Sequence, residues 1–199
     1  MITVVDYKLN NLRSIENTLR RLGHEVEVTS DPERVRNATK LILPGVGAFR
    51  DAMKNLESFG LIEPFVSKVR SGTPTLGICL GMHLLFEQSE EFGLHRGLDL
   101  LPGQVRKIPE GVHVPHMGWN QLQLRKTDPL LAGIEPGNFV YFVHSYYADP
   151  ADTEITLASV EHGIHFAAIV HRNNIWATQF HPEKSQKVGE RLLENFARI

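Results

Sequence analysis

The first part of the chain, to residue 78, alternates short apolar runs with segments whose apolar residues recur at helical spacing. The expected strands are the short apolar runs at residues 2–5, 40–43 and 75–78 and the segment 25–28, which alternates as an edge or half-buried strand would. The expected helices are an amphipathic segment from Leu12 that stops at Gly23, and the segments 49–56 and 61–69. Strands that alternate with helices predict a parallel sheet covered by helices on both faces. The expected fold class is therefore α/β, with a mostly parallel central sheet.

The pattern changes after Phe86, where β-like segments follow one another without intervening helices. These segments are residues 98–108, 122–124, 138–147, 155–160, 165–170 and 175–180. Antiparallel strands are therefore expected to flank the parallel core, and a final helix is expected over residues 184–197. Since the 199 residues contain no repeat or linker, a single domain spanning residues 1–199 is expected.

The charge balance excludes some classes of partner. With 21 basic and 23 acidic residues the net charge is −2, which gives no electrostatic reason to bind nucleic acid or an anionic membrane. No apolar stretch approaches the ~20 residues of a membrane span, and Asp6 comes too early for a signal peptide. The one cysteine, Cys79, cannot form an intramolecular disulfide, which agrees with a reducing compartment. A cytoplasmic protein is expected.

That cysteine lies in Gly77-Ile78-Cys79-Leu80-Gly81, directly after an expected strand. A glycine two residues to either side lets the backbone turn sharply from a strand into a helix, as in the nucleophile elbow of hydrolases, here with sulfur in place of oxygen. A helix that begins at Leu80 would direct its positive end at the sulfur and favour the reactive thiolate. The alternative is a small buried apolar side chain. The flanking glycines favour a nucleophile.

His181-Pro182-Glu183, near the C-terminus, offers a base and a carboxylate to orient it. Pro182 favours an extended conformation for His181, and in an extended chain residues i and i+2 point the same way. Glu183 can then hold one ring nitrogen of His181 while the other faces the sulfur of Cys79. Alternatively the segment begins a helix, with Pro182 in its first turn. The two interpretations are compatible.

Gly45-Val46-Gly47 follows the third expected strand, at the edge of the sheet where Cys79 is also expected. Two glycines allow a backbone N–H group to turn toward a developing anion without a Cβ atom in the way. Together with the N–H group of Leu80, this segment is a candidate oxyanion hole. The alternative is an ordinary tight turn.

Two pairs of histidines, His113 with His116 and His162 with His165, raise the question of a metal site. Neither pair has the i, i+4 spacing of a helical metal motif, an acidic partner in a known motif or a second cysteine. We therefore expect no metal ion, and no other cofactor.

The chain resembles the class I glutamine amidotransferases, in which a Cys-His-Glu triad releases ammonia from glutamine. The residues that carry the resemblance are Gly77-Ile78-Cys79-Leu80-Gly81-Met82 and Gln179-Phe180-His181-Pro182-Glu183, in the order that the family has them. Residues 114–120, 141–147 and 181–185 resemble one branch of the family, which acts in histidine biosynthesis. The resemblance spans nearly the whole chain.

The resemblance implies a role for each site residue. Cys79 would attack the carboxamide of L-glutamine, His181 would deliver a proton to the departing ammonia, and Glu183 would orient His181. The backbone groups expected to stabilise the oxyanion are those of Gly45, Val46, Gly47 and Leu80. The residues expected to bind the substrate are His83, Glu91, Ser145 and Tyr146, of which His83 stands where the family commonly has glutamine.

The resemblance also implies a partner, a separate (β/α)8-barrel cyclase that receives the ammonia. The residues expected at the interface or the ammonia gate are Asn11, Trp119, Tyr141 and Lys184. Other interpretations are the glutaminase subunit of a pyridoxal phosphate or aminobenzoate synthase, a stand-alone cysteine hydrolase, and a binding protein without activity. The segment Met117-Gly118-Trp119-Asn120 favours the cyclase branch, and the intact triad argues against an inactive protein.

Overall fold

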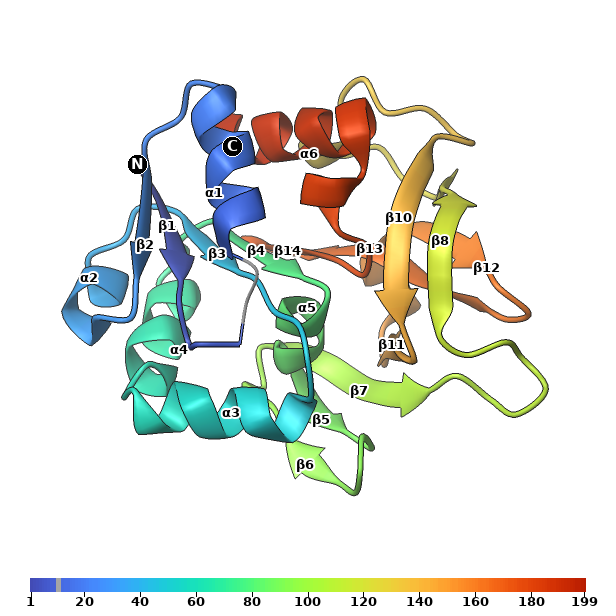
Figure 1. Ribbon diagram of the computed structural model, residues 1–199, viewed down its shortest axis with the longest axis horizontal. Coiled ribbons are helices and arrows are strands. Elements are labelled where there is room, and N and C mark those ends of the chain that lie inside the picture. Colours follow the sequence, from blue (N-terminus) through green and yellow to red (C-terminus); the bar gives the residue numbers. More distant parts are fainter. Residues whose placement is uncertain (10–11) are drawn as a thin grey trace.

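The computed structural model describes residues 1–9 and 12–199, and its centre is a large mixed sheet (Figure 1). The sheet has eight strands in the order β2-β1-β3-β4-β14-β13-β12-β9. They are β1 (Ile2–Val5), β2 (Val26–Thr29), β3 (Leu41–Leu43), β4 (Thr75–Ile78), β9 (Gln123–Leu124), β12 (Thr156–Glu161), β13 (His165–Arg172) and β14 (Ile175–Thr178). The strands from β2 to β14 run parallel, and β13, β12 and β9 continue the sheet antiparallel. The predicted α/β class is confirmed.

Helices cover both faces of this sheet, as predicted. They are α1 (Leu12–Arg21), α2 (Pro32–Arg36), α3 (Phe49–Ser58), α4 (Ile62–Arg70), α5 (Leu80–Leu84) and α6 (Gln186–Arg198). Because neighbouring residues of a strand point to opposite faces, Val4 of β1 packs in an apolar cluster with α1 and α6, whereas Val5 packs with α2, α3, α4 and α5. Figure 1 shows α1 and α6 on one side of the strands and α3 and α4 on the other. Within the described residues, no helix has the length and apolar character needed to cross a membrane.

Two smaller sheets lie beside the large one. The first pairs β8 (His116–Gln121) with β10 (Phe139–His144) in antiparallel register. The second has the order β11-β7-β5-β6 and consists of β5 (Phe86–Ser89), β6 (His95–Arg96), β7 (Leu101–Lys107) and β11 (Tyr146–Pro150). Since Ser145 alone separates β10 from β11, the chain passes from one small sheet into the other at this residue.

Some predicted elements need correction. Residues 138–147 form two strands that belong to different sheets. The segment 175–180 is not only an antiparallel flank, because β14 pairs antiparallel with β13 but parallel with β4. The final helix begins at Gln186, since residues Pro182–Lys184 form a 3₁₀ turn before it.

The sequence pattern also fails to predict α2, β5, β6 and β8. α2 has five residues, too few to show a helical period. In β8 the outward positions carry the exposed apolar side chains of Met117 and Trp119, so the usual alternation of apolar and polar residues is absent.

Candidate active site

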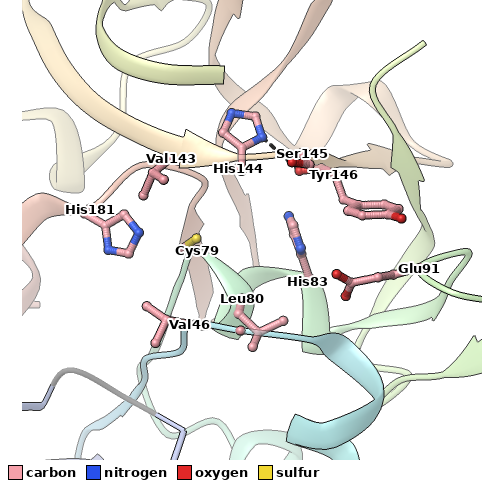
Figure 2. Close-up of a pocket in the computed structure, with 11 residues that line it drawn as sticks. Val46, Cys79, Leu80, His83, Glu91, Val143, His144, Ser145, Tyr146 and His181 are labelled. Carbon is pink, nitrogen blue, oxygen red and sulfur yellow. Dashed lines mark hydrogen bonds between the residues drawn. The ribbon is translucent and has the colours of Figure 1, made fainter. Parts of the chain in front are cut away.

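A cavity of about 370 Å³ lies at the carboxyl ends of β3, β4 and β14. Parallel sheets commonly place their sites at this edge. The residues that line it are Val46, Gly47, Cys79, Leu80, His83, Glu91, Val143, His144, Ser145, Tyr146 and His181. Figure 2 shows the sulfur of Cys79 between His181 on one side and His83 with Glu91 on the other. The predicted nucleophile, base and substrate-binding residues therefore share one cavity.

Cys79 sits at a sharp turn between β4 and α5, with φ 53° and ψ −109°. This left-handed conformation is strained for a residue with a Cβ atom. Close backbone passage explains the flanking glycines: a Cβ atom on Gly81 would lie 1.7 Å from the carbonyl oxygen of Leu43, and one on Gly77 would lie 2.7 Å from Leu85 Cδ1. The geometry is that of a nucleophile elbow.

His181 follows β14, the parallel neighbour of the strand that ends at Cys79. Its Nδ1 lies 2.8 Å from Glu183 Oε1, and both side chains are almost fully buried. Its Nε2 is buried and makes no hydrogen bond of ordinary geometry with any described residue. Burial disfavours the imidazolium, but the interactions with Cys79 and Glu183 outweigh burial and raise the pKa of His181 to about 10. The imidazolium form of His181 is therefore favoured near pH 7.

The loop that holds Gly45, Val46 and Gly47 has a positive φ of 98° at Gly47. The N–H group of Val46 donates to the carbonyl oxygen of Leu9 at 3.1 Å. In this conformation that N–H group is already bonded to another backbone group. Leu80, in contrast, begins α5, where the first N–H groups lack acceptors within the helix.

Tyr7 fixes the start of the same loop. Its hydroxyl group donates to the carbonyl oxygen of Pro44 at 2.7 Å, and a Cβ atom on Gly45 would lie 2.1 Å from that hydroxyl oxygen. Tyr7 is fully buried, which raises the pKa of its hydroxyl group far above the usual range. The neutral hydroxyl is thus a permanent donor to the loop.

Glu91 and His83 line the part of the cavity opposite His181. Burial raises the pKa of Glu91, and the N–H group of Phe49, which donates to Oε2 at 2.6 Å, partly offsets this rise. Burial lowers the pKa of His83 to about 4, so its ring is neutral near pH 7. His83 Nε2 lies 2.8 Å from Gln179 Oε1 and donates to it. Gln179 is a site neighbour that has no signal of its own in the sequence beyond the Gln-Phe-His-Pro-Glu motif.

Three of the expected interface residues lie together: Trp119 and Tyr141 are on the outer face of β8 and β10, and Lys184 is on the 3₁₀ turn beside them. Tyr141 pairs in register with Trp119, and their rings are 5.9 Å apart. Lys184 Nζ lies 5.9 Å from the centroid of the Tyr141 ring, and Trp119 is 46% exposed. The carbonyl oxygen of Tyr141 accepts from the N–H group of His181 at 3.0 Å, which ties this face to the site. Asn11 falls outside the described residues.

The histidine pairs do not form a metal site in the part of the chain that the structure describes. No group of three or more His, Cys, Asp or Glu side chains there could hold an ion. His116 and His162 instead stack on each other, with ring centroids 4.1 Å apart. His165 is exposed.

Comparison with known proteins identifies the family. The family model for glutamine amidotransferase class-I matches residues 3–199, so the chain belongs to the class-I glutamine amidotransferase family. A solved crystal structure of a glutamine amidotransferase has the same fold, with a TM-score of 0.79 and 20% identity over 100% of this chain and 98% of that chain.

Within the family, the chain is similar to proteins named imidazole glycerol phosphate synthase subunit HisH. The protein of Syntrophotalea carbinolica is 50% identical over 98% of this chain and 98% of its own length. That of Geobacter sulfurreducens is 49% identical over 100% of this chain and 98% of its own length. That of Aquifex aeolicus is 50% identical over 98% of this chain and 95% of its own length. The family predicted from the sequence is confirmed.

Proposed function

We propose that this chain is the glutaminase subunit of imidazole glycerol phosphate synthase, which hydrolyses L-glutamine and passes the ammonia to a separate cyclase subunit. The observation that carries the proposal is Cys79 on a strained elbow in a cavity that also holds the buried His181–Glu183 pair. The names of relatives about 50% identical over the full length support the choice of synthase. We also assign residues 1–199 to one amidotransferase domain of a cytoplasmic biosynthetic enzyme.

In the first half of the reaction, the thiolate of Cys79 attacks the side-chain carbonyl carbon of glutamine. The carbon–sulfur bond forms as the carbonyl oxygen takes up the negative charge. The imidazolium of His181 then gives its Nε2 proton to the amide nitrogen, the carbon–nitrogen bond breaks, and ammonia leaves. A glutamyl thioester remains on Cys79. Glu183 keeps the ring of His181 oriented through Nδ1.

In the second half, neutral His181 takes a proton from water, and the resulting hydroxide attacks the thioester. The carbon–sulfur bond breaks, glutamate leaves, and the thiolate–imidazolium pair is restored. Glu91 and the backbone of Ser145 and Tyr146 hold the amino-acid end of the substrate, with His83 beside them.

The oxyanion hole needs two donors, the N–H group of Leu80 and one from the Gly45–Gly47 loop. Since the N–H group of Val46 is bonded to Leu9, this donor has to be released before the transition state is fully stabilised. Loss of a single oxyanion donor costs about 3 to 4 kcal/mol in comparable hydrolases, so loop position can switch the enzyme. We assign the release to the binding of the cyclase, a (β/α)8 barrel. The cyclase docks near Trp119, Tyr141, Lys184 and Asn11. It takes the ammonia and forms imidazole glycerol phosphate and AICAR.

The substitution Cys79→Ala in the complete two-subunit enzyme tests this function. Synthesis that depends on glutamine should be abolished, because no thioester can form. Synthesis from added ammonium should continue at the wild-type rate, because the cyclase site is intact. Loss of both activities would contradict the role of an ammonia donor. Full glutamine hydrolysis by the wild-type chain alone would favour a stand-alone hydrolase. Glutaminase activity stimulated only by a pyridoxal phosphate or aminobenzoate synthase would show that the chain is a subunit of that enzyme.

A further inference from the structure

A chain of side-chain hydrogen bonds connects the cavity wall to β8. His144, the last residue of β10, lines the cavity, and His116, the first residue of β8, faces it in the antiparallel register. His116 Nδ1 lies 2.8 Å from His144 Nε2, and His144 Nδ1 lies 2.8 Å from the carbonyl oxygen of Tyr146. At the other end, Asn120 Nδ2 lies 3.2 Å from His116 Nε2. Both rings are buried.

The acceptor at one end fixes the direction of every bond. A carbonyl oxygen only accepts, so Nδ1 of His144 carries its proton and donates to Tyr146. Nε2 of neutral His144 then accepts, and the donor is the Nδ1–H group of His116. Nε2 of neutral His116 accepts in turn from the amide of Asn120, whose Nδ2 also donates to the carbonyl oxygen of Glu161 at 2.8 Å.

The surroundings keep both rings uncharged. Phe142 stacks on His116 with centroids 4.6 Å apart, and Phe166 meets His144 edge-on at 5.1 Å. Burial lowers the pKa of His116 to about 4 and that of His144 well below its usual range. The titratable groups that face the pair are His83 from α5 and His162 from the β12–β13 turn, and a charge on either disfavours a second charge on His144. One arrangement of protons therefore satisfies every hydrogen bond from Tyr146 to Asn120.

We propose that His144 and His116 are positioning residues, which hold the backbone of Ser145 and Tyr146 in the orientation that binds the amino-acid end of glutamine and tie that backbone to Asn120 on β8. The inference rests on the proposed function, since it concerns the glutamine site. Ser145 and Tyr146 line the cavity at the junction of two small sheets, where Ser145 lies in neither strand. The side chain of His144 is bonded to this junction. β8 also carries the exposed Met117 and Trp119, so the same series of hydrogen bonds connects the outer face to the proposed substrate site.

The kinetic test compares two substitutions in the complete enzyme. His116→Phe keeps an aromatic ring in the stack but removes both ring nitrogens, and so leaves Nε2 of His144 buried without its donor. KM for glutamine should rise roughly tenfold while kcat changes less than about twofold, as expected for loss of one hydrogen bond with a buried partner left unmade. His116→Asn, whose amide N–H can replace Nδ1–H, should restore most of the affinity. His165→Phe, the same change at an exposed histidine, is the matched control and should leave both constants unchanged.

A spectroscopic test needs no activity. In the free chain with ¹⁵N-labelled histidine, His116 and His144 should both show the Nδ1–H tautomer and should not titrate between about pH 6 and 8. His116→Phe should shift the signals of His144. An Nε2–H tautomer at His144, or titration of either ring in that range, would overturn the inference. So would an unchanged KM in His116→Phe, or a fall in kcat and melting temperature without a change in KM, which a merely structural role would give. If the wild-type complex fails to hydrolyse glutamine, the proposed function fails, and the tautomer result still decides the hydrogen-bond chain.

Discussion

At the scale of single residues, the site is built on strain and burial. Cys79 is held at a positive φ, and His181 and Glu183 are removed from water, so the proposed nucleophile and its proposed base are positioned before substrate arrives. β4 and β14, the strands that precede Cys79 and His181, are hydrogen-bonded neighbours, so the sheet brings the two residues to the same edge.

Glu183→Gln should lower kcat by about 10²- to 10⁴-fold, because the orienting carboxylate is lost. Glu183 helps to raise the pKa of His181, so without its charge that pKa falls and the imidazolium loses its proton at lower pH. The alkaline limb of the kcat/KM profile of the complex should therefore move to lower pH. The matched control is Glu194→Gln, which breaks the His24–Glu194 pair outside the cavity lining and should leave the profile unchanged. An alkaline limb that stays in place would contradict the role of Glu183.

Residues with a local signal could be predicted from the sequence. Cys79 has its two glycines, and His181 and Glu183 are two residues apart in an extended segment. No such signal marks the bond from Val46 to Leu9 or the pair of His144 with His116, because their partners lie far apart along the chain and only the fold brings them together.

At the scale of elements, the loop at residues 44–47 is held by the segment that follows β1. Tyr7 binds its first residue and Leu9 binds Val46. The loop therefore has one fixed end and one bond whose release frees the donor.

Val46→Pro removes the N–H group that is proposed to stabilise the oxyanion. Glutaminase activity of the complex should fall about 10²- to 10³-fold, while ammonium-dependent synthesis is kept. Val46→Ala keeps the N–H group and is the control, with activity near wild type. If Val46→Pro is as active as Val46→Ala at equal melting temperature, another group is the donor.

Tyr7→Phe removes the hydroxyl group and leaves the carbonyl oxygen of Pro44 buried without that donor. The free energy of unfolding should fall by about 1 to 3 kcal/mol, as measured by urea denaturation. Tyr141→Phe, the same change at a tyrosine that is only half buried, is the comparison and should lower the free energy of unfolding less. An unchanged free energy for Tyr7→Phe would show that the loop does not depend on this bond.

Most of the parallel half could be predicted, because its strands are short apolar or alternating runs and its longer helices have a clear period, whereas α2 is too short to show one. The second half could be predicted only in outline. Ser145 breaks a continuous β-like run without a glycine or proline to mark the break, and the parallel partner of β14 is a strand about a hundred residues earlier, which no local pattern reveals.

At the scale of the whole molecule, the outer face of β8 and β10 is the proposed docking surface. Trp119→Ala should weaken association with the cyclase by about 30-fold, since an aromatic side chain at the centre of an interface commonly dominates its energy. Phe92→Ala, at an exposed aromatic residue on the β5–β6 turn, is the matched control and should leave association unchanged. Titration calorimetry measures both. Equal affinity of Trp119→Ala and wild type would place the interface elsewhere.

The bond between Val46 and Leu9 also bears on how a cell can make this protein. On the proposed function, copies that have not met a cyclase keep their oxyanion donor engaged and consume little glutamine. A surplus of this chain then releases little free ammonia and glutamate. A cell can therefore make this chain in moderate excess over the cyclase, because the surplus copies are held nearly inactive by their own backbone geometry.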